Sequence, residues 1–199
     1  MSNLEFHFDF GSPNAYLAHR ATPQIEARTG ASFTYVPVLL GGVFKATNNV
    51  SPAVSMQGIK NKPDYARIET ERWLAAYGIE PYTPNPHFPV NTLQIMRGAV
   101  YAQQAGIFDV YVDEVYKHMW QQSLKMDDAE VMVAAFKASG LPVEDILTGM
   151  QDPQVKQQLI SNTEASVARG TFGSPTFYVG DEIYFGKDSL RDVEAVISQ

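Results

Sequence analysis

The stretch "LEFHFDFGSPNAYLAHR", residues 4–20, decides how the chain begins to fold. Apolar side chains stand at every second position from Leu4 to Phe10, with polar residues between most of them, which is the period of a half-buried strand. Gly11-Ser12-Pro13 then leads into a segment with helical spacing. The stretch therefore predicts a strand followed directly by a helix, with the small hydroxyl of Ser12 at the junction.

Outward from this stretch, residues 32–44 ("SFTYVPVLLGGVF") are rich in β-branched and aromatic residues and predict a second strand closed by a glycine pair. A strand, a helix and a strand in this order indicate a βαβ unit with parallel pairing. Helical spacing dominates from residue 45 to about 149. The last fifty residues predict a helix from Pro153, two short strands around Gly180-Asp181 and a terminal helix.

This order predicts an α/β protein with a discontinuous domain. Residues 1–44 and 150–199 would form one sheet with its helices, and residues 45–149 would form an inserted helical domain. The alternative is two unrelated small domains.

The composition of the chain argues against several classes of function. The net charge of −7, with no run of Lys or Arg, speaks against a nucleic-acid or anionic-membrane partner. The chain contains no cysteine, which excludes disulfides, thiolate metal ligands and dithiol chemistry by the protein itself. The four histidines lack metal-ligand spacing, so we expect no metal site.

The beginning of the chain shows no secretory signal pattern, and no apolar run is long enough to span a membrane. These features predict a cytoplasmic protein.

Ser12 lies where the amide groups of a helix are unpaired and its dipole is positive. The simpler interpretation is a helix N-cap, which is the commonest role of serine at this position. The alternative is an active hydroxyl beside a bound anion such as a carboxylate, a phosphate or a thiolate.

Other polar segments carry a structural and a functional interpretation. Pro175 at the mouth of a strand favours either a cis Ser174-Pro175 bond, which would leave the Ser174 backbone open to an extended ligand, or an edge strand. Asp188 or Ser189 could cap the last helix or hold a ligand. Lys62 precedes a helix, where a cation does not stabilise the dipole. Asn91-Thr92 most simply caps another helix.

Three motifs carry a resemblance that extends over almost the whole chain. "FDFGSPNAYLA", "GTFGSPTFYV" and "FGKDSL", in this order, resemble the kappa-class glutathione transferases and the 2-hydroxychromene-2-carboxylate isomerases. The resemblance implies a thioredoxin-like fold with an inserted all-helical domain, related to the bacterial disulfide oxidoreductases.

The resemblance also implies a glutathione site. Ser12, where the redox relatives hold the attacking cysteine, would donate a hydrogen bond to the glutathione sulfur. The backbone of Ser174 before a cis Pro175 would pair with the cysteinyl part. Asp188 and Ser189 would hold the γ-glutamyl end, although relatives often have arginine at the second of these positions. Lys62 and Asn61 would meet the glycyl carboxylate.

The activity implied by the resemblance is glutathione-dependent isomerisation of 2-hydroxychromene-2-carboxylate to trans-o-hydroxybenzylidenepyruvate, by reversible thiolate addition and bond rotation. Such a reaction belongs to naphthalene-type aromatic catabolism, and the family also implies a homodimer. The alternatives are a kappa-class transferase and a non-catalytic glutathione-binding module. A small aromatic carboxylate needs apolar walls and a cation or amide donors, for which the candidates are Phe44, Trp73, Phe88, Asn91 and Arg97.

Overall fold

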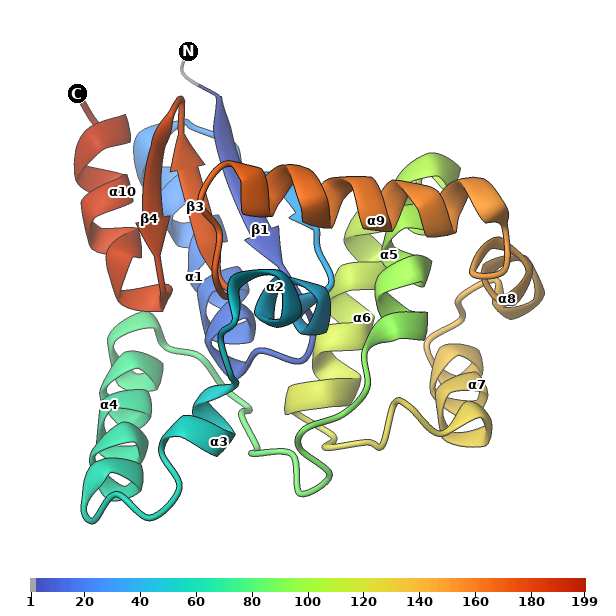
Figure 1. Ribbon diagram of the computed structural model, residues 1–199, viewed down its shortest axis with the longest axis horizontal. Helices are drawn as coiled ribbons and strands as arrows, with labels where there is room; N and C mark the ends of the chain where they lie inside the picture. The colour runs from blue at the N-terminus through green and yellow to red at the C-terminus, as the bar shows by residue number, and fades with distance from the viewer. Residues whose placement is uncertain (1–2) are drawn as a thin grey trace.

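A computed structural model describes residues 3–199 (Figure 1). The chain begins as predicted, with strand β1 (Leu4–Phe8) and helix α1 (Pro13–Thr29). The side chain of Ser12 accepts a hydrogen bond from the Ala15 amide at 3.1 Å, so Ser12 caps this helix. The predicted N-cap is therefore confirmed, and it fixes the hydroxyl at the end of the first strand.

The sheet has four strands in the order β2-β1-β3-β4. Strand β2 (Thr34–Pro37) pairs with β1 in parallel, and the hairpin of β3 (Thr176–Val179) and β4 (Glu182–Phe185) continues the sheet antiparallel on the other side of β1. Two segments more than a hundred residues apart thus form one sheet. The predicted α/β, thioredoxin-like fold is confirmed.

The helices cover the sheet in two layers. Figure 1 shows α9 (Pro153–Ala168) crossing in front of the strands, with α1 behind them. Helix α10 (Leu190–Ile197) contacts both α1 and β3. The core between these layers is rich in buried aromatic side chains, among them Phe6, Phe8, Phe10, Tyr16 and Phe177.

The remaining helices occupy the middle of the chain and its end. They are α2 (Leu40–Thr47), α3 (Pro52–Ser55), α4 (Lys62–Tyr77), α5 (Leu93–Ala105), α6 (Phe108–Trp120), α7 (Ala129–Ala138), α8 (Val143–Gly149) and the short η1 (Lys187–Ser189). The predicted boundary at residue 44 falls inside α2, and the boundary at residue 149 coincides with the end of α8. Among the described residues no helix is long and apolar enough to cross a membrane.

The prediction of one strand over residues 32–44 is wrong in its second half. The strand ends at Pro37, and Leu40 begins α2. The Leu40 amide is bound by the Asp9 carboxylate at 2.7 Å instead of by a neighbouring strand. A Cβ atom on Gly42 would lie 3.2 Å from Thr163 Cγ2, so the glycine allows a close approach of α2 to α9. Gly42 therefore serves helix packing, and the glycine pair does not terminate a strand.

Close packing of α5 on its neighbours gives a first prediction. A Cβ atom at Gly98 would lie 2.0 Å from the Tyr111 hydroxyl and 2.7 Å from Met150 Cε, and both side chains are buried. We expect Gly98→Ala to lower the free energy of unfolding by about 1–3 kcal/mol, the usual cost of overpacking. Urea-induced unfolding measures this change.

The matched control is Gly41→Ala in helix α2, where an added Cβ atom meets no atom within 4 Å. Since alanine has the higher helix propensity, this variant should be neutral or gain up to about 1 kcal/mol. Equal stability of the two variants would contradict the packing described for α5.

Candidate active site

The candidate site lies at the end of the sheet where β1 ends and α1 begins. The Ser12 hydroxyl is almost buried and donates a hydrogen bond to the Ser174 carbonyl oxygen at 2.8 Å. The Ser174-Pro175 peptide bond is cis, as one of the two interpretations of the sequence predicted. Two residues 162 positions apart are thus brought into direct contact.

A second contact extends this group toward the last helix. The Gly186 amide donates to the Pro175 carbonyl oxygen at 2.9 Å, so the turn that carries Asp188 and Ser189 lies beside Pro175. The Ser189 hydroxyl donates to the Phe185 carbonyl oxygen at 2.6 Å and does not cap the last helix. Ser189 thus stands at the N-cap position of the last helix, as one of the alternatives predicted, but its side chain makes no capping bond because the hydroxyl donates to strand β4.

Lys187 was not singled out from the sequence, although it stands inside the "FGKDSL" motif. Its side chain is only 3 % exposed, and Nζ lies 2.7 Å from Asp188 Oδ1 and 3.7 Å from Glu69 Oε2. The same ammonium lies 4.9 Å from the ring centroid of Trp73. One cation therefore faces two carboxylates, and the cluster has a net negative charge.

Helix α4 carries the remaining predicted glutathione ligands. Lys62 and Asn61 are both exposed and stand at the N-terminus of this helix, two turns from Glu69. Figure 1 shows α3 and α4 beyond the end of the sheet where α1 begins. Within residues 3–199 no hydrogen bond or ion pair joins the two side chains to Ser12 or Ser174.

Asp9 is a second residue of this site that the sequence did not indicate. Its carboxylate is fully buried and accepts hydrogen bonds from the Gly11 amide (2.8 Å), the Leu40 amide (2.7 Å) and the Thr92 hydroxyl (3.0 Å). Burial raises the pKa of Asp9 above the ordinary value, while the three donors act in the opposite direction.

The backbone of Asp9 extends the same network. Its amide donates to Ser174 Oγ at 3.2 Å, and its carbonyl oxygen accepts from the Ser12 amide at 3.1 Å. One residue thus joins the turn before α1, the start of α2, the start of α5 and the loop before β3. This network holds the Ser12 hydroxyl and the Ser174 carbonyl in place.

The five predicted substrate-pocket residues are not gathered at this site. Trp73 is buried and donates from its indole to the Leu17 carbonyl oxygen at 3.3 Å, so it packs against α1. Phe88 is about one-third exposed, and its ring centroid lies 6.0 Å from that of Trp120. Asn91 is exposed and caps α5 by accepting from the Leu93 amide at 3.1 Å.

The other two candidates lie near α2. Phe44 is half-buried in this helix, and Arg97 lines a separate cavity between α2, α5 and α9. Two exposed aromatic side chains that were not among the candidates flank Ser174 in the sequence. They are Phe172, two residues before it, and Phe185 at the end of β4, and their ring centroids lie 4.4 Å apart.

A sheet in this order, with a helix N-terminus facing a cis-proline loop, defines a protein of the thioredoxin-fold class, with serine at the junction of β1 and α1. The chain belongs to the DSBA-like thioredoxin domain family, whose family model matches residues 3–198.

Two kinds of named protein are similar to this chain over almost their whole length. The chain is 26% identical over 196 residues to a 2-hydroxychromene-2-carboxylate isomerase of Pseudomonas putida, with 98% of this chain and 94% of the relative covered. It is 25% identical over 214 residues to glutathione S-transferase kappa 1 of Caenorhabditis elegans, with 100% and 92% covered. A solved structure of a 2-hydroxychromene-2-carboxylate isomerase superposes with a TM-score of 0.83 at 26% identity, covering 98% of this chain and 93% of the other. The resemblance expected from the motifs is confirmed.

Proposed function

We propose that the protein is a glutathione-dependent isomerase of the 2-hydroxychromene-2-carboxylate type. The observation that carries the proposal is the Ser12 hydroxyl, held at the N-terminus of α1 and 2.8 Å from the Ser174 carbonyl oxygen, in a chain without cysteine. Since the protein has no thiol of its own, sulfur chemistry at this position requires a thiol from outside. Glutathione, when bound, supplies a thiolate that adds reversibly to a conjugated carbon.

The donor set of the site fits a glutathione molecule. The Ser12 hydroxyl and the positive end of α1 stabilise an anion beside them. The Ser174 backbone offers a carbonyl acceptor, to which the Ser12 hydroxyl is the one donor among residues 3–199. Lys62 and Asn61 are exposed polar groups able to bind a carboxylate.

The γ-glutamyl end of glutathione is zwitterionic, and the proposal assigns its ammonium group to the turn that carries Asp188 and Ser189. Asp188 is a half-exposed carboxylate suited to the ammonium group. Ser189 cannot replace the arginine found in many relatives, and its hydroxyl is engaged by Phe185. The ammonium of Lys187 lies beside Asp188, but its side chain is only 3 % exposed and already faces the carboxylates of Asp188 and Glu69, so we assign it no contact with the ligand.

The proposal includes a small aromatic carboxylate as substrate, a place in naphthalene-type aromatic catabolism, a homodimer and a cytoplasmic location. The named isomerase relatives support the reaction. The kappa-class relative supports a second candidate, a transferase that conjugates glutathione to electrophiles. The third candidate is a glutathione-binding module without turnover.

Assays of isomerisation, conjugation and glutathione binding together separate the three candidates. We expect the purified protein to isomerise 2-hydroxychromene-2-carboxylate only when glutathione is present, with the thiol concentration unchanged at the end. Loss of free thiol with formation of a thioether from chlorodinitrobenzene, and no isomerisation, would establish the transferase instead. Glutathione binding without either reaction would establish the binding module.

A further inference from the structure

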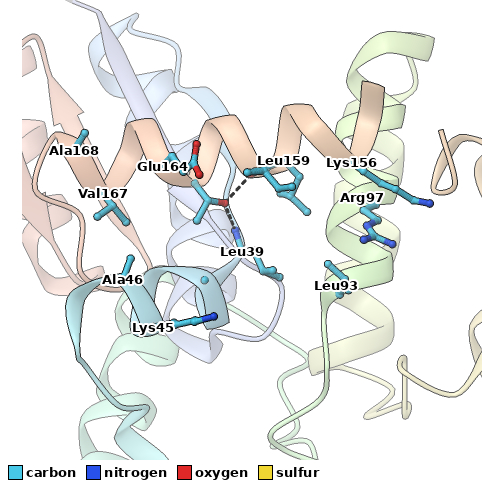
Figure 2. A pocket seen from close by; sticks show the side chains of 13 residues that line it. Leu39, Lys45, Ala46, Leu93, Arg97, Lys156, Leu159, Glu164, Val167 and Ala168 are labelled. Carbon is cyan, nitrogen blue, oxygen red and sulfur yellow. Dashed lines mark hydrogen bonds between the residues drawn. The ribbon is translucent and has the colours of Figure 1, made fainter. Parts of the chain in front are cut away.

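An elongated cavity lies away from Ser12, between helices α2, α5 and α9 (Figure 2). Its volume of about 560 Å³ is within the range of small-molecule sites. Most of the lining side chains are apolar. They are Leu39, Ala46, Leu93, Leu159, Ile160, Val167 and Ala168, with Gly42 and Thr163 between them.

One face of α9 forms the length of the cavity. Its lining residues recur every three or four positions from Lys156 to Ala168, which places them on one side of the helix. At the rise of an α-helix this face is about 18 Å long. The cavity therefore fits an extended ligand better than a round one.

Basic side chains are concentrated in this cavity. Lys45, Arg97 and Lys156 line it, with Glu164 as the single acidic residue. Within residues 3–199 none of the three cations forms an ion pair, although the chain as a whole has a net charge of −7. Three unneutralised cations on apolar walls favour an anionic occupant.

Two of the three cations, Arg97 and Lys156, lie together in the cavity, whereas Lys45 lies beside Ala46 (Figure 2). Figure 2 shows Arg97 and Lys156 at one end and Val167 and Ala168 at the other. Arg97 and Lys156 are both half-buried, so an anion between them would be partly shielded from water. A cavity with two cations at one end and apolar side chains along its length matches an amphipathic molecule with one anionic group.

The cavity is distinct from the glutathione site. No residue of β1, α1 or β3 lines it, and neither Ser12 nor Ser174 does. Leu39 before α2 and Gly42 and Ala46 within it line the cavity, whereas Phe44 does not and lies on another side of the same helix.

We propose that this cavity is a second binding site, for a small amphipathic carboxylate. The carboxylate would bind Arg97 and Lys156, because guanidinium and ammonium groups donate charge-assisted hydrogen bonds to it. The apolar part would lie along Leu159, Ile160 and Val167. This site does not depend on glutathione or on the reaction proposed at Ser12.

Calorimetric titration with octanoate, and with octanol as its uncharged counterpart, tests the proposal. We expect saturable binding of one octanoate per chain and at least about tenfold weaker binding of octanol. In the double variant Arg97→Gln/Lys156→Gln, octanoate should bind about tenfold or more weakly, while octanol affinity stays the same. Lys137→Gln, which removes an exposed cation of α7, is the matched control and should bind octanoate like the original chain.

Three outcomes would overturn the proposal. The first is unsaturable octanoate binding, or equal binding to the double variant and the original chain. The second is competition between octanoate and glutathione, which would place the ligand at Ser12. The third is a dimer in solution that dissociates when half-exposed Ile160 is changed to glutamate, because a second copy of the chain would then cover the groove.

Discussion

Replacing Ser12 by alanine should raise the pKa of protein-bound glutathione thiol by about one to two pH units while glutathione still binds. A free thiol titrates near pH ~8.5, and helix N-termini and hydrogen-bond donors lower that value. A shift of two units corresponds to about 2.7 kcal/mol. One hydrogen bond to a charged group together with the dipole of α1 can supply this energy.

The Ser12 hydroxyl takes part in two hydrogen bonds that bear on this measurement. The Ser12 hydroxyl donates its proton to the Ser174 carbonyl oxygen, so it has to rotate in order to donate to a sulfur atom. The alanine variant also loses the cap on the Ala15 amide, which costs about 1 kcal/mol of stability. The thiol pKa is therefore the informative readout, measured by thiolate absorbance against pH.

Ser174→Ala is the matched control for this measurement. It removes a hydroxyl of the neighbouring residue, which accepts from the Asp9 amide at 3.2 Å, and leaves the Ser174 backbone in place. We expect the bound thiol to keep its low pKa in this variant. An unchanged thiol pKa in Ser12→Ala would show that Ser12 is a helix cap and nothing more.

Replacing Asp9 by alanine should lower the free energy of unfolding by about 3–5 kcal/mol. The change leaves three buried donors without an acceptor, namely the Gly11 amide, the Leu40 amide and the Thr92 hydroxyl. Each unsatisfied buried donor costs about 1–3 kcal/mol. Urea-induced unfolding at neutral pH measures the loss, and the Asp9→Asn variant, which retains one acceptor oxygen, should lose less.

The Asp9→Asn variant also isolates a pH dependence. Since burial raises the pKa of Asp9 in the folded state, its contribution to stability is complete below the unfolded value of about 3.9. That contribution is lost as the pH rises through the pKa of Asp9 in the folded protein. The free energy of unfolding of the original chain, relative to that of Asp9→Asn, should therefore fall as the pH rises from the pKa of the unfolded chain through that of the folded protein. A difference that does not change with pH would contradict the raised pKa.

Local signals in the sequence were sufficient for the elements around Ser12. The alternating strand, the Ser12-Pro13 cap and the proline at the mouth of β3 each depend on a few neighbouring residues, and all three are found in the structure. The end of β2 was misplaced because the apolar run continues past Pro37. Its change to helix depends on Asp9 and Thr163, which lie far away in the sequence.

The candidate site could be predicted only in part for the same reason. Asp9 occupies a polar position in an alternating strand, which suggests exposure, and its burial results from partners 31 and 83 residues away. For the substrate pocket, the sequence offers only residue type within a largely helical block of the chain. Packing decides which helix faces point inward, and it buries Trp73 against α1 and directs Arg97 into another cavity.

The most direct test of the proposed glutathione chemistry is the thiolate absorbance of glutathione as pH is varied, with and without the original protein. We predict that the protein moves the titration midpoint of the bound thiol at least about one pH unit below that of free glutathione. An unmoved midpoint at protein concentrations that saturate glutathione binding would contradict thiol activation at Ser12. The same would be true if glutathione did not bind at all.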